Sequence, residues 1–302
     1  MESESVWGSC RFLTASVLPV ARACNLRCPF CFSRSSISAL ERTQISELEL
    51  DEYFAFARER GASRLVVTGG GEPLLRPELV LEIVEAGRAW FDEIACFTNG
   101  TFLTARLADA LAERGLTYLC WSRHHDEDVQ NKRLMGADAP ALDDFLTRAA
   151  RLPVRATCVM TSGAIETKVD ALRYAEALRA ARARTWAGDG PPRLELTFKH
   201  TYVSYPGSLF GGSAANEWSR AHRVAIDPFE GDPECPVVAE LPWGPKIRDV
   251  AGLRTCFYYE PTPLWEKDHR ICRSANLMAD GRVFASLEDA QSELKSWRHH
   301  PS

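Results

Sequence analysis

The chain has little that would direct it to a membrane or to nucleic acid. Its 302 residues contain no apolar run near the roughly 18 residues that a membrane-spanning helix needs. The first residues, 1–7, are acidic and lack the pattern of a signal peptide. Positive charge is not in excess either, because 36 basic residues stand against 41 acidic ones and give a net charge of -5. We therefore expect a cytoplasmic protein whose partners include neither a membrane nor nucleic acid.

Ten cysteines are present, and three of them lie within eight residues. Cys24, Cys28 and Cys31 have the spacing Cys-x3-Cys-x2-Cys. Such thiolates favour zinc, copper(I) or an iron–sulfur cluster, but no fourth Cys or His lies nearby to complete a tetrahedral zinc site. The alternative is a hydrophobic turn filled by cysteines, and the flanking Arg22 and Arg27 argue against it. We expect reduced cysteines and a metal centre rather than disulfides.

The cysteine motif is followed about forty residues later by a glycine-rich turn, Gly70-Gly71-Glu72-Pro73. Together with Phe30 immediately before the last cysteine, this pair of motifs resembles the radical S-adenosylmethionine (SAM) superfamily. The resemblance implies a [4Fe–4S] cluster held by the three cysteines, with SAM bound to its open iron. It also implies an electron donor such as flavodoxin or ferredoxin, and a 5′-deoxyadenosyl radical that abstracts hydrogen from a substrate. A non-enzymatic iron–sulfur or zinc-binding module would have no use for the glycine-rich turn.

Strand and helix patterns alternate over the first two thirds of the chain, which predicts an α/β fold with a parallel sheet. The family implies a partial (β/α)6 TIM-like barrel, which agrees with six strands. We assign residues 1–204 to this barrel with its cluster and SAM site, and residues 205–302 to a C-terminal extension that closes it. The extension is rich in Gly, Pro and Trp, and a helix is expected there only at 287–297. The expected strands are 12–20, 64–68, 94–98, 118–122, 154–160 and 194–203, and the helices are 48–60, 77–90, 105–114, 141–151 and 169–184.

The SAM site is predicted from the resemblance and from strand ends. Gly70 and Gly71 allow a close approach of the backbone to a ligand, and the family binds the SAM ammonium there through backbone carbonyls, with Glu72 beside them. Phe30 is expected along the adenine. The ribose and carboxylate are expected near three residues that end the third and fourth strands, namely Thr98, Asn99 and Ser122. An ordinary turn and helix caps are the alternatives for these segments.

Substrate contacts are expected from two further strand ends. Arg123 and His124 follow the fourth strand directly, and the next residue, His125, is assigned to either the cavity or a solvated loop. In the sixth strand, alternation places Glu195, Thr197 and Lys199 on one face. The opposite face takes Leu194, Leu196, Phe198, His200 and Tyr202. A mid-strand lysine is costly to bury unless it is paired or faces a polar cavity, so Glu195 and Lys199 predict a polar barrel wall.

The extension contains three cysteines, Cys235, Cys256 and Cys272. The stretch that begins at Cys272 resembles the auxiliary-cluster modules of many radical SAM enzymes, but Ser286 stands where their second cysteine would be. Three roles stay open: an auxiliary cluster, a hydrogen-atom donor, and buried structural cysteines. Because a full cluster normally takes four thiolates, we predict one cluster and not two.

These features predict a radical SAM enzyme that acts on a small polar metabolite, such as a sugar, nucleoside or amino-acid derivative. The polar face of the sixth strand and the absence of an evident peptide-recognition domain in the sequence favour this class. The alternative within the superfamily is radical modification or epimerisation of a peptide residue, in which a C-terminal cysteine would return a hydrogen atom.

Overall fold

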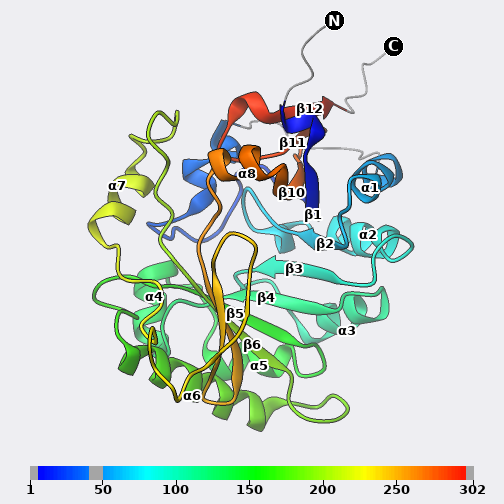
Figure 1. Ribbon diagram of the computed structural model, residues 1–302. Coiled ribbons are helices and arrows are strands. Elements are labelled where there is room, and N and C mark those ends of the chain that lie inside the picture. The colour runs from blue at the N-terminus through cyan, green and yellow to red at the C-terminus, as the bar shows by residue number, and fades with distance from the viewer. Residues whose placement is uncertain (1–5, 41–49, 297–302) are drawn as a thin grey trace, which may run out of the picture.

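The computed structural model describes residues 6–40 and 50–296. One sheet of twelve strands organises these residues, in the order β12-β11-β10-β1-β2-β3-β4-β5-β6-β9-β8-β7 (Figure 1). Its two outermost strands, β12 and β7, do not pair, so the sheet stays open. The strands are β1 Arg11–Val17, β2 Arg64–Val67, β3 Ile94–Thr98, β4 Tyr118–Ser122, β5 Val154–Val159, β6 Leu194–Lys199, β7 Val237–Glu240, β8 Lys246–Val250, β9 Leu253–Tyr258, β10 Ile271–Leu277, β11 Arg282–Phe284 and β12 Glu293–Ser296.

The central run of this sheet, from β10 through β1–β6 to β9, is parallel throughout. The C-terminal strands β10 and β9 extend β1–β6 at its two sides, and antiparallel strands complete the edges. In Figure 1 the blue first strand therefore lies beside the orange β10, from the other end of the chain. An open sheet of parallel strands is the partial (β/α) barrel predicted from the sequence.

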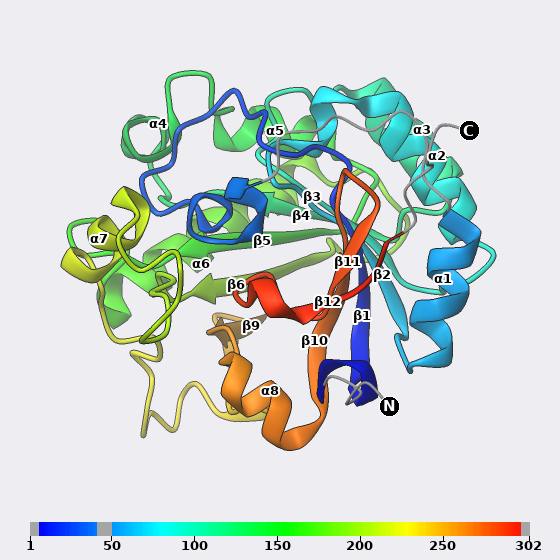
Figure 2. The ribbon, with the colours of Figure 1, turned by 90° about the horizontal axis from the view of Figure 1, so that it is seen from above.

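Helices follow the parallel strands and cover the sheet, and α1–α3 lie together along one side of the molecule in both views (Figure 2). Within the described residues, no helix is both long and apolar enough to cross a membrane. The α-helices are α1 Leu50–Glu59, α2 Pro77–Gly87, α3 Ala105–Glu113, α4 Asp128–Met135, α5 Leu142–Arg148, α6 Lys168–Thr185, α7 Ala214–Ala221 and α8 Pro263–His269. Short 3-10 helices are η1 Val6–Ser9, η2 Phe32–Ser35, η3 Ile37–Leu40, η4 Pro73–Leu75 and η5 Ala290–Ser292.

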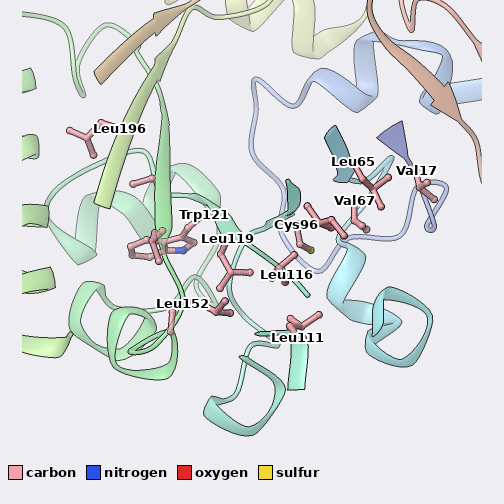
Figure 3. Packing of buried hydrophobic residues seen from close by; sticks show 14 of the residues in the cluster. Val17, Leu65, Val67, Cys96, Leu111, Leu116, Leu119, Trp121, Leu152 and Leu196 are labelled. Atoms are coloured by element: carbon pink, nitrogen blue, oxygen red, sulfur yellow. The ribbon is translucent and has the colours of Figure 1, made fainter. Parts of the chain in front are cut away.

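The core between sheet and helices forms because alternate strand residues point to opposite faces. In β6 the apolar residues Leu194, Leu196 and Phe198 are buried, whereas the residues between them are half-buried. Side chains from neighbouring strands, such as Val67, Cys96 and Leu119, pack into one cluster with helical residues (Figure 3). The core holds the strands in register, and the carboxyl ends of β1–β6 therefore gather at one end of the barrel.

The six predicted strands and the five predicted helices are all found, with ends shifted by up to four residues. The sixth strand is shorter than expected and ends at Lys199. The helix expected at 287–297 is wrong, because its described part contains only η5 and β12. The sequence also did not predict α4, α7, α8 or the strands of the extension. The division at residue 204 stays a prediction, although strands from both sides of it share one sheet.

Candidate active site

A cavity of about 220 Å³ lies at the carboxyl ends of the parallel strands. The cysteine loop between β1 and η2 forms one wall, and the ends of β2–β6 and of β9 contribute to the others. Ligand sites in open α/β sheets occur at this end of the strands. The residues predicted from the sequence that line it are Cys24, Cys28, Phe30, Cys31, Gly71, Glu72, Thr98, Asn99, Ser122, His124 and Lys199.

The three cysteines of the loop carry free thiols and share this cavity. Burial raises the pKa of Cys28 to about 12, and burial also raises that of Cys24, with the neighbouring thiols adding to both shifts. A metal must therefore displace these protons when it binds. In the described parts of the chain, no three Cys, His, Asp or Glu side chains converge tightly enough for a single metal ion. Three free thiols on one wall fit a cluster, which distributes its ligands over several irons, better than one zinc ion.

The glycine-rich segment packs directly against this loop. Glu72 N–H donates to Ala23 O at 2.8 Å, and Gly70 N–H donates to Val20 O at 3.1 Å. A Cβ at Gly70 would lie 1.7 Å from Ala21 O, and one at Gly71 would lie 1.8 Å from Ala23 O. Real Cβ contacts are not that short. The glycines are needed because two backbone segments touch, and Gly70 itself does not line the cavity. The predicted approach of a ligand to this backbone therefore stays a prediction for Gly71, which lines the cavity, and is not supported by the position of Gly70.

The buried side chain of Glu72, which follows β2, forms hydrogen bonds with the end of β3. Its Oε1 accepts hydrogen bonds from Thr98 Oγ1 at 2.7 Å and Leu74 N at 3.0 Å, and its Oε2 accepts one from Asn99 N at 2.8 Å. Burial raises the pKa of this carboxyl, and the three hydrogen bonds oppose that shift. Because these donors engage both oxygens, the carboxylate positions the strand ends around the cavity.

Asn99 continues this connection to the cysteine loop. Its Nδ2 donates to Asn25 Oδ1 at 2.9 Å and lies 3.8 Å from Cys24 Sγ. Ser122, at the end of β4, also faces the cavity. Thus the three strand-end residues predicted for SAM lie on one cavity together with the cysteines.

His124 faces the cavity and Arg123 does not. His124 Nδ1 accepts a hydrogen bond from Val159 N at 3.0 Å, and its ring packs edge-on to Phe30 with centroids 4.7 Å apart. Burial, followed by the charges of Lys199 and Arg123, lowers the pKa of His124 to about 3, so the ring is neutral.

Arg123 points away from the cavity. It is fully buried, and its guanidinium donates to Asp126 O and Asp128 Oδ1, each at 2.7 Å. Its predicted substrate contact is thus not supported by its position. His125 is buried too, and its Nδ1 lies 3.2 Å from Asp126 Oδ1, so it does not belong to a solvated loop.

The two polar residues predicted on β6 have different surroundings. Lys199 lines the cavity and forms an ion pair with Glu260 at 3.1 Å. Burial, followed by the charge of Arg273, lowers the pKa of Lys199 to about 8. Glu195 lies four residues earlier, toward the amino ends of the strands, and pairs with Arg155 at 2.6 Å. It is not among the cavity residues, which corrects its predicted contact with the substrate.

A family model described as the Radical SAM superfamily matches residues 18–178. The chain belongs to the radical SAM superfamily. It is therefore an enzyme whose cofactors are a [4Fe–4S] cluster and SAM, and the resemblance seen in its cysteine and glycine motifs is confirmed. The three thiols and the adjoining strand ends described above fit these two groups.

Among curated relatives, the GTP 3′,8-cyclase of Chlorobaculum tepidum is 35% identical over 274 residues, covering 80% of this chain and 78% of that protein. The GTP 3′,8-cyclase of Aquifex aeolicus is 35% identical over 115 residues, covering 37% of this chain and 35% of that protein. That of Syntrophomonas wolfei is 38% identical over 103 residues, covering 33% and 30%. The chain thus spans about a third of the length of the last two relatives.

Solved structures of Streptococcus suis SuiB share the fold of this radical SAM enzyme. The complex with SAM has a TM-score of 0.53 at 15% identity, covering 95% of this chain and 63% of SuiB. The complex with the precursor peptide SuiA has a TM-score of 0.53 at 14% identity, covering 92% and 60%. At this identity the likeness shows the fold alone.

Sequence analysis missed several cavity residues of this radical SAM barrel. His200 and Tyr202 were assigned to the core-facing side of the sixth strand, but β6 ends at Lys199 and both side chains reach the cavity. Tyr258 and Glu260 come from β9 and the segment after it, in the extension. The alternation of apolar and polar residues in 253–258 could have predicted this strand. Its parallel pairing with β6 could not be predicted, because no local sequence pattern indicates which strands pair.

The cysteines of the extension do not line the cavity. Cys272 is fully buried on β10, where its thiol contacts that of Cys10. Cys235 is buried too, beneath Arg248, which donates to the carbonyl of Cys235 at 2.7 Å. Cys256 lies half-buried on β9 beside Thr197. The prediction that Cys272 lies at the catalytic site is therefore wrong, because this residue lies in the hydrophobic core.

Proposed function

We propose that this enzyme binds SAM at the barrel mouth and abstracts hydrogen from a small polar metabolite, such as a sugar, nucleoside or amino-acid derivative. The observation that carries the proposal is the ion pair of Lys199 with Glu260, which lines the same cavity as the three cysteines. A charged pair in a buried site offers both a donor and an acceptor to polar groups of a substrate. When bound, the cluster supplies the electron that breaks a carbon–sulfur bond of SAM.

The surrounding residues take distinct roles in this proposal. Cys24, Cys28 and Cys31 would hold the cluster, and the backbone at Gly71 would meet the SAM ammonium. Glu72 would act indirectly, because its oxygens already accept bonds from the β3 end and from Leu74. Phe30 would lie along the adenine, with Thr98, Asn99 and Ser122 near the ribose and carboxylate.

His124 would contribute a single proton donor to the ligands in the cavity. Its Nδ1 is occupied by Val159 N–H, so the proton of the neutral ring resides on Nε2. A neutral donor at this place orients a polar group without adding charge beside Lys199.

The relatives support a small-molecule substrate, because the name GTP 3′,8-cyclase states that those proteins act on GTP, a nucleotide. Peptide modification is the alternative, since SuiB was solved with a precursor peptide. Peptide epimerisation with Cys272 as hydrogen donor is less well supported, because that thiol is buried against Cys10 and not at the cavity.

A reductant completes the proposed reaction. Enzymes of this superfamily need an electron source, and we propose a flavodoxin or ferredoxin acting in the cytoplasm. The free cysteines of the described residues are compatible with a reducing compartment.

The test is anaerobic reconstitution with iron and sulfide, followed by reduction with dithionite in the presence of SAM. We expect 5′-deoxyadenosine to form, and none to form in the Cys24→Ala/Cys28→Ala/Cys31→Ala variant. The substrate class is then tested with deuterated sugars, nucleosides, amino acids and peptides. Deuterium in 5′-deoxyadenosine from a small metabolite supports the proposal, and deuterium from peptides only would replace it with the alternative.

A further inference from the structure

A second cavity, of about 710 Å³, adjoins the first. The two cavities share the lining residues His200, Tyr202, Tyr259 and Glu260. Its volume lies within the range of about 300–1,000 Å³ that small-molecule sites occupy. The second cavity therefore offers room for the part of a substrate that extends beyond the first.

One wall of this cavity is a loop that α7 anchors. Asn216 of α7 is fully buried, and its Oδ1 accepts a hydrogen bond from Ser204 N at 3.0 Å. Its Nδ2 donates to Phe210 O at 3.2 Å and Gly211 O at 3.1 Å. One amide side chain thus holds both ends of the segment 204–211, which lines the cavity, so this wall has a defined conformation.

Two arginines face this cavity, and each is held by a neutral acceptor. Arg220 Nη2 donates to Gly211 O at 2.8 Å, and Arg223 Nη2 lies 3.1 Å from His200 Nδ1. His200 Nε2 lies 2.8 Å from Val224 O and 2.9 Å from Arg223 Nε, so the ring donates to the carbonyl from Nε2 and accepts from Arg223 Nη2 at Nδ1. Burial and the charge of Arg223 lower the pKa of His200, which keeps the ring neutral. Among residues 6–40 and 50–296, the hydrogen bonds of both arginines go to neutral groups and neither arginine forms an ion pair.

The acidic groups on the other wall are already engaged. Glu260 accepts from Lys199 Nζ at 3.1 Å and Tyr258 OH at 2.7 Å, and it also pairs with Arg273. Burial raises the pKa of Glu288 to about 7. The positive side of the cavity therefore faces one carboxylate that is paired with other residues, Glu260, and one whose ionisation is opposed by burial, Glu288.

Aromatic side chains also line the second cavity, near Glu260. Trp243 and Trp265 have ring centroids 6.0 Å apart. Trp243 Nε1 donates to Tyr259 O at 2.7 Å, and Tyr259 OH donates to Trp243 O at 2.9 Å. This reciprocal pair fixes rings that can pack against the neutral part of a ligand.

We propose that Arg220 and Arg223 bind an anionic group of the substrate, a phosphate or a carboxylate, in this second cavity. The inference rests on the proposed function and narrows its substrate class to anionic metabolites. The neutral part of the substrate packs along the Trp243–Tyr259 wall, and its reacting part extends past Glu260 toward Lys199. Arginine suits this role because its planar guanidinium forms charge-assisted, bidentate bonds with such oxyanions.

Calorimetric titration of the reconstituted, SAM-loaded protein tests the proposal, with inorganic pyrophosphate and succinate as probes at constant ionic strength. We expect at least one probe to bind, and Arg220→Gln/Arg223→Gln to weaken it about ten- to a hundredfold. Arg106→Gln removes an exposed positive charge from α3 and serves as the control with unchanged affinity. Tighter binding of pyrophosphate than of succinate identifies a phosphate, and the reverse order a carboxylate.

The conservative variant Arg220→Lys/Arg223→Lys keeps the charge and guards against a folding defect of the glutamine variant. Its affinity is expected between those of the wild type and the glutamine variant. The proposal is overturned if the wild type binds neither probe up to about 10 mM. It is equally overturned if the lysine and glutamine variants bind the probe alike, or if Arg106→Gln weakens binding as much as they do.

The same preparation separates this inference from the proposed function. A wild-type protein that cleaves SAM but binds neither probe refutes the anion site alone. One that binds pyrophosphate without ever producing 5′-deoxyadenosine refutes the proposed reaction and leaves the anion site in place.

Discussion

The carboxylate of Glu72 accepts a hydrogen bond from the backbone N–H of Asn99 at 2.8 Å, in the buried space between β2 and β3. Asn99 in turn reaches Cys24, with its Nδ2 3.8 Å from the sulfur. One chain of contacts thus links the glycine-rich segment, the end of β3 and the cysteine loop. The geometry of the cluster site depends on residues that need not touch the cluster.

Replacing Glu72 with Gln tests this link. Glutamine offers one acceptor oxygen where the carboxylate offers two, so a buried N–H or hydroxyl loses its partner. We expect the free energy of unfolding in urea to fall by about 1–3 kcal/mol, and SAM to bind more weakly. Glu82→Gln, on an exposed position of α2, should change stability by less than about 0.5 kcal/mol. Equal stabilities of the two variants would contradict the role of Glu72.

Gly71→Ala tests the contact between the glycine segment and the cysteine loop. The added Cβ would lie 1.8 Å from Ala23 O, so the loop must move. We expect both SAM affinity and iron content to fall, the latter from about four irons per chain to less than half of that. Gly212→Ala is the control, because nothing lies within 4 Å of its added Cβ. Full iron content with only SAM binding lost would instead favour a gap kept open for the ligand.

Local sequence patterns predicted the barrel strands, and the family resemblance together with the strand ends predicted part of the cavity lining, from Cys24 to Lys199. Both Arg123 and His124 were predicted to contact the substrate, but alternation beyond β4 places Ser122 and His124 on one face and Arg123 on the other, and only His124 lines the cavity. The register of β6 predicted Lys199 in the cavity, but alternation alone cannot tell the mouth of a barrel from its floor, where Glu195 pairs with Arg155.

The extension could not be predicted in the same way. Strand β10 contains two buried polar residues, Ser274 and Asn276, whose side chains form a hydrogen bond of 2.9 Å. Because of these polar residues, its sequence lacks the apolar pattern that predicts a buried strand. Its partner, β1, lies more than 250 residues earlier in the chain. Helix α4 is short and mostly polar, with Met135 and Asn131 as its buried residues, so it has no apolar stripe to detect. The sequence also predicts Ser46 as the N-cap of the helix expected at 48–60, and this residue lies outside the described ones.

The iron content of cysteine variants tests the prediction of one cluster. We expect about four irons per chain in the wild type and none in the Cys24→Ala/Cys28→Ala/Cys31→Ala variant. Single changes of Cys235, Cys256 and Cys272 to Ala should retain the iron and SAM cleavage, because these thiols lie apart from the cavity. Cys272→Ala should cost about 1 kcal/mol of stability through the space left in the core. Four irons in the triple variant would demonstrate a second cluster.

The neutral, buried His124 predicts how stability depends on pH. Its pKa is lowered from 6.5 to about 3 in the folded protein, mainly by burial. Below pH 6.5 the unfolded chain therefore binds a proton that the folded protein does not, and stability is lost as the pH falls toward 3. The loss from this group is about 1.4 kcal/mol per pH unit, or about 2 kcal/mol between pH 6.5 and pH 5.

Urea denaturation of the metal-free protein at several pH values measures this loss. His124→Asn keeps an acceptor for Val159 N but cannot be protonated, so its stability should fall by about 2 kcal/mol less than that of the wild type over the same interval. His269→Asn, on an exposed position at the end of α8, should keep the pH dependence of the wild type. If His124→Asn loses as much stability as the wild type between pH 6.5 and 5, then His124 is protonated in the folded state, and the neutral donor proposed for the cavity is wrong.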